Sequence, residues 1–135
     1  MSSDDVSIPT SDVIEGTKHP SEAPAVIGHN DAENLFVDAL NKGRLHHAWM
    51  LIGPKGIGKA TFAWRLAKNL LCSQIKEERP SLFGDAPQKI PNLNIDPDHP
   101  SLRRIHAGSE GRLSIVRRPY DARRKVFKAH ITIEE

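Results

Sequence analysis

A glycine-rich loop constrains this chain more than any other feature of its sequence. Residues 53–59 read Gly-Pro-Lys-Gly-Ile-Gly-Lys, which fits the pattern G-x-x-x-x-G-K. Glycines let successive backbone N–H groups turn inward around phosphate oxygens, and the start of a following helix adds partial positive charge. Lys59 is placed to reach the terminal phosphates of a bound nucleotide. The loop therefore predicts a phosphate-binding turn between a strand and a helix.

The segments on both sides of the loop agree with this prediction. Residues 48–52 (Ala-Trp-Met-Leu-Ile) form a short continuous apolar run, which is typical of a strand buried on both faces of a parallel sheet. After the loop, apolar residues recur at helical spacing from Phe62 to Leu71, with Arg65, Lys68 and Asn69 expected to face outward. The sequence thus predicts an α/β fold of the P-loop NTPase type, a three-layer sandwich around a parallel sheet.

Another helix is expected before the apolar run. Asn30 can cap it, Glu33 stands in the capping-box position, and Gly43 is suited to end it. Later elements are shorter: a helix over 101–107, then possible strands at 113–116 and 131–133. Two or three strands do not complete a parallel sheet, so we expect only the N-terminal part of such a domain.

Composition divides the chain into regions. Residues 1–24 are polar and acidic with three prolines, which predicts a disordered tail before a domain over 25–135. Five prolines between residues 73 and 100 predict a flexible linker within that domain. There is no basic, apolar secretory signal and no run of roughly 20 apolar residues, so a soluble, cytoplasmic protein without membrane contact is expected.

Metal chemistry receives little support from the sequence. The chain has one cysteine, Cys72, which excludes a cysteine-rich zinc module and is expected to be a buried thiol on a helix. His46 and His47 are adjacent and point apart on an extended chain, so they are not expected to bind metal. No catalytic and no metal-ligating residue is therefore predicted.

The position after Lys59 departs from the usual phosphate loop. A serine or threonine there would bind Mg²⁺ through its hydroxyl, but this chain has Ala60. Thr61 is the next residue, and one helical step rotates it by about 100° away from the site. The sequence predicts either a nucleotide site that binds ATP weakly and holds Mg²⁺ poorly, or a degenerate loop that has only a structural role.

Three stretches together resemble a known family. Residues 27–29 (Ile-Gly-His), 43–49 (Gly-Arg-Leu-His-His-Ala-Trp) and 51–59 are similar to the opening of the AAA+ domain of bacterial clamp loaders. Residues 96–100 (Asp-Pro-Asp-His-Pro) and 118–121 (Arg-Pro-Tyr-Asp) are similar to stretches of delta-prime-type subunits of DNA polymerase III from alphaproteobacteria. The resemblance extends from about residue 24 to the end of the chain and is weakest across 73–95.

The resemblance implies a function and a site. Family members of this type sit in a hetero-pentamer with gamma/tau and delta subunits and help the ATP-driven loading of the sliding clamp onto primed DNA. A delta-prime-type subunit often does not hydrolyse ATP, which suits Ala60; it belongs to a polymerase holoenzyme without being catalytic itself. The nucleotide-contacting positions implied by the loop and the family are Gly53, Pro54, Lys55, Gly56, Ile57, Gly58, Lys59, Ala60 and Thr61, with Ile27 and Gly28 near the adenine.

Other functions stay open at the level of sequence. A gamma/tau motor subunit would carry serine or threonine after Lys59 and four cysteines in the next segment, and a small P-loop kinase would need the same hydroxyl. A third alternative is a nucleic-acid-binding module that uses the basic residues 117–128, with Tyr120 available for stacking. We favour a solvated loop for that stretch, because Asp121 and nearby acidic residues dilute its charge.

Overall fold

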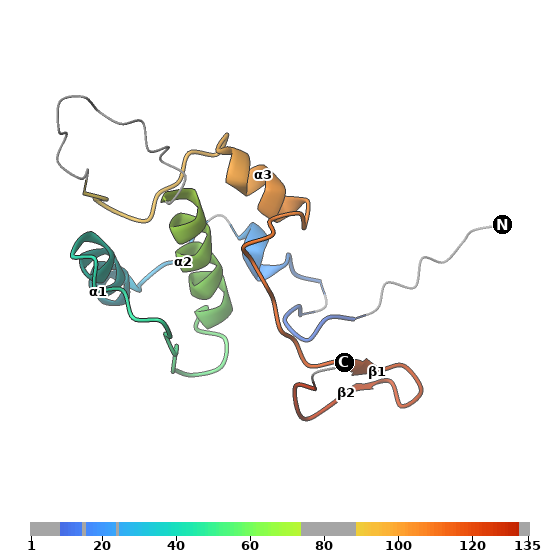
Figure 1. The fold of residues 1–135 in the computed structure, drawn as a ribbon. Helices are drawn as coiled ribbons and strands as arrows, with labels where there is room; N and C mark the ends of the chain where they lie inside the picture. The colour runs from blue at the N-terminus through green and yellow to red at the C-terminus, as the bar shows by residue number, and fades with distance from the viewer. Residues whose placement is uncertain (1–8, 15, 24, 74–88, 133–135) are drawn as a thin grey trace.

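The computed structural model describes residues 9–14, 16–23, 25–73 and 89–132. Within these ranges the chain forms a short 3₁₀ helix η1 (Pro20–Glu22) and three α-helices, α1 (Asn30–Asn41), α2 (Lys59–Ser73) and α3 (Pro100–His106). A two-residue hairpin follows, with antiparallel strands β1 (Tyr120–Asp121) and β2 (Val126–Phe127). Helix α2 lies between α1 and α3, and the hairpin lies at the opposite end of the molecule from α3 (Figure 1).

The three α-helices confirm what the sequence pattern predicted. Helix α1 begins at the expected Asn30, and Gly43 adopts φ 63° where the chain leaves the helix, a conformation that glycine accepts without a steric cost. The capping box is wrong, however. His29 occupies the cap position without a side-chain bond, and the Glu33 carboxylate instead accepts hydrogen bonds from Arg65 and from the backbone N–H of Leu93.

Two apolar clusters hold the helices together. The first joins α1 to α2 through four buried side chains and is closed by Leu93, which is only 1% exposed. Its other members are Phe36, Val37, Phe62 and Leu66. The second joins α2 to α3 through Leu71, Cys72, Leu102 and Ile105, so the prediction of a buried Cys72 is confirmed. Asn69 is also buried, at 4% exposure, although the sequence predicted that it faces outward.

The predicted buried strand over 48–52 is wrong. These residues form no strand, and the side chains of Met50 and Ile52 are 80% and 82% exposed. Trp49, predicted to be a core residue, is 37% exposed, and its ring packs edge to face with that of Phe36 at a centroid distance of 5.3 Å. A strand requires a neighbour to bond its N–H and C=O groups, and none of the described residues forms a strand beside this segment.

The same reason applies to the segment 113–116, which was expected to be a strand and is irregular. Among the residues described here, the only sheet is the antiparallel β1–β2 hairpin, inside the stretch that was expected to be a charged loop. A parallel sheet and the three-layer sandwich around it therefore stay predictions. The possible strand at 131–133 extends past the described residues.

Part of the predicted linker is held in place by α1. The side-chain amide of Asn41 donates to the Ile90 carbonyl and accepts from the Ile90 N–H, both at 2.8 Å. This pair of bonds imitates the backbone pairing of a strand. Residues 74–88 lie outside the described residues, so the linker prediction stays open there.

The N-terminal segment also contacts the helices. Element η1 packs against α2, with the Lys68 ammonium donating to the Ser21 carbonyl and the His19 ring edge-on to Trp64 at 5.5 Å. Asp12 accepts a hydrogen bond from Arg117 at 2.7 Å, which joins residues 105 positions apart. Residues 1–8 lie outside the description, and a domain boundary near residue 24 stays a prediction.

Candidate nucleotide site

The glycine loop leads directly into α2. Gly56 and Gly58 adopt φ values of 83° and 94°. Residues that carry a side chain rarely adopt this backbone conformation, so both positions require glycine. The Gly58 carbonyl accepts the Phe62 N–H at 2.9 Å and thereby begins the hydrogen-bond ladder of the helix. The turn predicted from the sequence is therefore present at a helix start, although no strand precedes it.

Lys59 closes back onto its own loop. Its ammonium group donates to the carbonyls of Gly53 and Pro54, at 2.7 and 2.6 Å. These two bonds fix the lysine head over the mouth of the turn. A lysine that contacts a nucleotide phosphate would have to exchange these carbonyl acceptors for phosphate oxygens.

His29 links the start of α1 to the loop. Its Nε2 lies 2.8 Å from the Ile57 carbonyl, and since a carbonyl can only accept, Nε2 carries the proton. The ring also packs at 5.6 Å from Phe62 of α2. No separate role was predicted for His29 from the sequence. The signal available was its place beside Ile27 and Gly28 in the first family-like stretch.

Ile27 and Gly28 lie next to this contact. Ile27 is 90% exposed and Gly28 has a φ of 83°, so the chain turns sharply just before His29 and leaves the isoleucine facing solvent. The His29 bond thus brings the predicted adenine-side segment to the phosphate loop.

Ala60 and Thr61 occupy different sides of the first turn of α2. Ala60 is exposed, whereas Thr61 lines a cavity of about 270 Å³ together with Trp64 and Lys68, beneath η1. The threonine hydroxyl is therefore on a different face from the phosphate loop. No residue of the loop replaces the missing hydroxyl at position 60.

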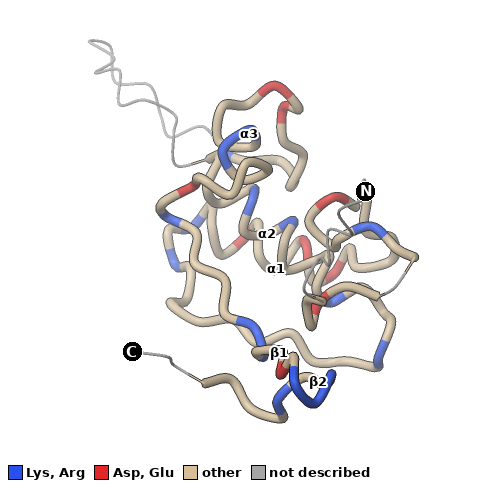
Figure 2. Tube along the Cα trace, turned by 90° about the vertical axis from the view of Figure 1, so that its right-hand side faces the viewer, with Lys and Arg blue, Asp and Glu red and all other residues tan. Residues whose placement is uncertain are grey.

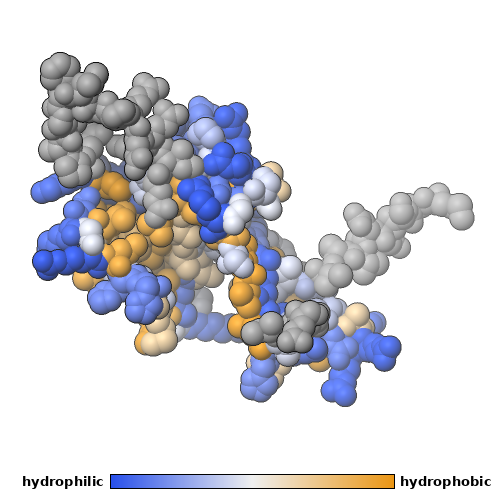
Figure 3. All heavy atoms as spheres, viewed as in Figure 1, coloured by the Kyte–Doolittle hydropathy of each residue, from blue (hydrophilic) through white to orange (hydrophobic). Residues whose placement is uncertain are grey.

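An apolar cavity of about 310 Å³ adjoins the loop between α1 and α2. Its lining comes from both helices, the apolar run 49–52 and the loop: His29, Ala32, Leu35, Trp49, Met50, Leu51, Ile52, Ile57, Lys59, Phe62 and Leu66. Figure 3 shows hydrophobic residues gathered on the face over these helices. The cavity places apolar contacts and one cation side by side.

The loop presents backbone donors and one cation at the start of α2. Within the described chain, the N–H groups of Gly56, Ile57 and Gly58 donate no hydrogen bond to protein, so they remain available to anionic oxygens. Lys59 supplies a positive charge beside them. The described residues contain no cluster of three His, Cys, Asp or Glu side chains suited to a metal. The geometry can accept an anion at a helix start.

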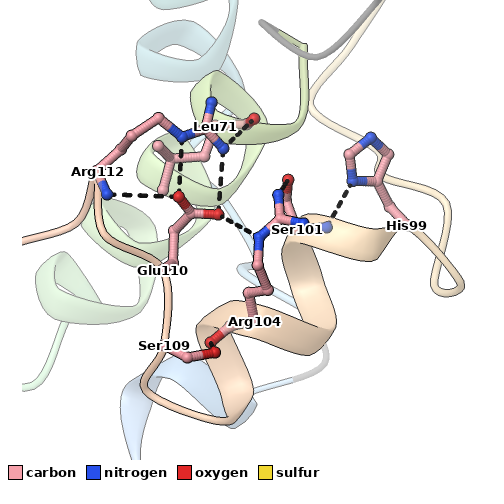
Figure 4. Close-up of polar contacts among 7 residues, drawn as sticks. All are labelled: Leu71, His99, Ser101, Arg104, Ser109, Glu110 and Arg112. Carbon is pink, nitrogen blue, oxygen red and sulfur yellow. Dashed lines mark hydrogen bonds and ion pairs between the residues drawn. The ribbon is translucent and has the colours of Figure 1, made fainter.

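A separate polar cluster stabilises the far end of α2 (Figure 4). The buried Glu110 carboxylate accepts from Arg112 at 2.8 and 3.1 Å and from Arg104 at 3.1 Å. Arg112 also contacts the Leu71 carbonyl at 3.4 Å. The Arg112 hydrogen bonds, helped by Arg104, lower the pKa of Glu110 from 4.5 to about 2. This cluster, which the sequence did not indicate, is structural, since it joins α2, α3 and the chain that follows.

Of the described helices, none combines the length and the apolar character that a membrane span requires. Elsewhere, His46 and His47 are both exposed.

Comparison with known proteins identifies the family. A family model described as "DNA polymerase III, delta subunit" matches residues 28–127. DNA polymerase III subunit gamma of Buchnera aphidicola subsp. Acyrthosiphon pisum is 47% identical over 47 residues, which cover 35% of this chain and 13% of the relative. DNA polymerase III subunit gamma/tau of Mycobacterium tuberculosis (strain ATCC 25618 / H37Rv) is 32% identical over 85 residues, covering 57% and 15%.

DNA polymerase III subunit tau of Escherichia coli (strain K12) is 36% identical over 53 residues, covering 39% of this chain and 8% of the relative. The matched segments thus span only 8% to 15% of the length of these three proteins. No solved structure matches the chain. Because the family model covers well over half of the 135 residues and includes the whole glycine loop, the chain belongs to the DNA polymerase III delta-subunit family of clamp-loader proteins.

Proposed function

We propose that this chain is the N-terminal part of a delta-prime-type clamp-loader subunit whose nucleotide site is degenerate. In this role it assembles with gamma/tau and delta subunits in the cytoplasm and helps their ATP-driven loading of the sliding clamp onto primed DNA. The observation that carries the proposal is the combination of the family match with Ala60 directly after Lys59. A chain without the magnesium-binding hydroxyl suits a subunit that supports the motor instead of hydrolysing ATP.

The geometry of the loop supports a weak site. Lys59 is occupied by two carbonyls of its own loop, and Thr61 lies on a different helix face. Both features lower the expected affinity of the loop for Mg²⁺–ATP. ATP is therefore expected to bind weakly, with little dependence on Mg²⁺.

A second candidate is a gamma/tau-type motor subunit. It is favoured by the names of the relatives, which are gamma, gamma/tau and tau subunits. It is disfavoured by position 60, where a motor subunit needs a hydroxyl to hold its metal. The two candidates therefore differ in how strongly they bind ATP with Mg²⁺.

Calorimetric titration of the 135-residue chain with ATP, once with Mg²⁺ and once without it, distinguishes the two candidate functions. A delta-prime-type subunit should give a weak affinity that is nearly the same in both titrations. A tight, strongly Mg²⁺-dependent affinity would contradict the proposal and favour the motor subunit. Recovery of the parent protein with gamma/tau and delta partners tests the clamp-loader role itself, because a P-loop kinase would not bring these partners with it.

A further inference from the structure

The β1–β2 hairpin is a compact structure with its own internal packing. Tyr120 pairs with Phe127, and Asp121 pairs with Val126. The Lys128 N–H donates to the Pro119 carbonyl at 2.9 Å, which closes the base of the hairpin. The Tyr120 and Phe127 rings meet edge to face at 5.2 Å. The stretch that looked like a loop is thus a defined element.

The stretch that contains the hairpin carries a local excess of positive charge. Residues 117–128 contain six basic residues and one acidic residue, a formal charge of +5, whereas the entire chain carries only +2. The rest of the chain therefore sums to −3. Figure 2 shows Lys and Arg gathered around β1 and β2 at one end of the molecule. Such a separation of charge directs the positive end toward anionic partners.

The acidic residue of the hairpin does not offset the basic ones. The Asp121 carboxylate accepts hydrogen bonds from the N–H groups of Arg123 and Arg124, at 3.0 and 3.1 Å, and so stabilises the turn. Its separation from the Arg124 guanidinium is 3.9 Å, and that side chain is 83% exposed. An exposed pair at this distance is weak, so the guanidinium stays available to a partner.

Lys125 ends the turn of the hairpin in a strained backbone conformation. Its φ of 52° makes it the only non-glycine residue with a positive φ in the described part of the chain. A left-handed conformation costs free energy for a residue that carries a side chain. Glycine or asparagine would remove much of that cost, so a lysine at this position points to use of its charge.

The root of the hairpin is fixed to the N-terminal segment. Arg117 donates to Asp12 at 2.7 Å and lies beside His19. Five cations then remain on exposed residues beyond this root: Arg118, Arg123, Arg124, Lys125 and Lys128. The hairpin thus presents its charges from an anchored position.

We propose that the β1–β2 hairpin binds the phosphate backbone of nucleic acid directly and without reading its sequence. This goes beyond the proposed function, in which DNA is reached through the assembled complex, and it rests on the hairpin alone. Guanidinium groups match phosphate oxygens in two-bond geometry. The rings of Tyr120 and Phe127 pack on each other, and Arg118 covers Phe127 at 5.8 Å, so they support the hairpin instead of stacking on bases.

An acidic peptide is a less suitable partner for this surface. Arginine clusters can bind acidic motifs, but a peptide gains specificity from pockets for its other side chains. The aromatic pair of the hairpin is already used internally, and the three successive cations 123–125 form a convex tip. Phosphates repeated along a backbone can meet such a tip in many registers.

The test compares two triple variants of the full 135-residue chain. The hairpin variant is R123Q/R124Q/K125Q, and the control variant is R44Q/K89Q/R103Q, which removes three exposed cations elsewhere. Each takes the formal charge from +2 to −1, so any difference between them reports the place of the charges and not their sum. Circular dichroism checks that both variants keep their helices.

Fluorescence anisotropy then measures binding to labelled single-stranded and duplex DNA at 50–200 mM salt. The hairpin variant should bind about tenfold more weakly at 50 mM salt, and its slope of log affinity against log salt should fall by about 2 to 3. The control variant should remain close to the wild-type chain. DNA sequences of different base composition should bind alike.

Four results would overturn the proposal. The first is that the wild-type chain fails to bind DNA at 50 mM salt. The second is that the two variants weaken binding equally, which would leave only an effect of net charge. The third is that labelled polyglutamate binds the wild-type hairpin at least as tightly as DNA does, which would assign the surface to an acidic protein. A strong preference for one base sequence would contradict the backbone-only contact.

Discussion

At the scale of single residues, the character of the loop depends on position 60. Ala60 was recognised from the sequence alone, because a motif of fixed spacing states which chemistry each position supplies. The structure adds that Thr61 faces a different cavity and that Lys59 bonds to Gly53 and Pro54. The His29 contact could not be foreseen, since its partner is a backbone carbonyl 28 residues away that any residue type would offer.

The first prediction concerns restoration of the missing hydroxyl. Ala60→Ser should raise ATP affinity in the presence of Mg²⁺ by about tenfold, equivalent to ~1.4 kcal/mol, and leave it unchanged without the metal. Calorimetric titration measures both values. Ala63→Ser is the matched control, because it adds the same hydroxyl to an exposed position further along the same helix. An equal gain in both variants would contradict the role given to position 60.

The second prediction concerns pH and the Glu110 cluster. The pKa of Glu110 is lowered to about 2 in the folded chain, against an ordinary value of 4.5. The ionised carboxylate therefore contributes stability above pH 4.5, and this contribution is lost as the pH falls toward 2. Glu110→Gln should lower the free energy of unfolding at pH 7 and flatten its decline between pH 4.5 and 2.

Urea unfolding at a series of pH values measures this profile. Asp38→Asn serves as the control, since the Asp38 side chain is 58% exposed and pairs with Lys42 at the surface. The control should keep the wild-type shape of the curve. A Glu110→Gln profile that runs parallel to the wild-type curve would show that the cluster does not act through this charge.

At the scale of elements, local sequence patterns predicted correctly those elements whose formation depends on residues close in sequence. Helices α1, α2 and α3 were predicted because apolar spacing and a following glycine act within a few residues. The strand at 48–52 was predicted from the same kind of run, but a strand also needs a partner from elsewhere in the chain. The capping box at Glu33 failed for a related reason, since Arg65 and Leu93 compete for that carboxylate.

One start signal was not anticipated in any form. The tripeptide His-Pro-Ser occurs at residues 19–21 and again at 99–101, and in both places the histidine Nδ1 accepts the serine N–H at 3.1 Å. Histidine is not among the preferred capping residues. Here it caps η1 and α3 in the same way, with proline in the first helical turn.

The third prediction tests this cap in α3. His99→Ala removes the acceptor for the Ser101 N–H and should cost about 1 kcal/mol of stability, whereas His99→Asn keeps a short acceptor and should cost much less. Urea unfolding followed by circular dichroism at neutral pH measures the difference. Equal losses for the two variants would mean that the ring acts through packing and not through its hydrogen bond.

At the scale of the whole molecule, stability comes from two clusters that share α2, while other large apolar side chains remain at the surface. Leu66 is 7% exposed within the first cluster, and Ile52 is 82% exposed beside the loop. A composition-based estimate would treat the two residues alike. The two residues contribute differently to stability, because only a buried side chain removes apolar area from water.

The fourth prediction follows from that contrast. Leu66→Ala should lower the free energy of unfolding by about 2–5 kcal/mol, whereas Ile52→Ala should change it by less than about 0.5 kcal/mol. Each variant truncates a large aliphatic side chain to the same methyl group, so each is a control for the other. A large loss for Ile52→Ala in urea unfolding would show that residues 48–52 are buried in solution.

The bond between Arg117 and Asp12 matters for anyone who trims this protein. The composition of residues 1–24 suggests a shortened protein that starts at residue 25. Such a truncation removes Asp12 and His19, and with His19 the ring contact to Trp64. The guanidinium at the root of the hairpin would lose its anchor and gain freedom to rotate. A trimmed protein would then present its positive end in many orientations, although every basic side chain on it was kept.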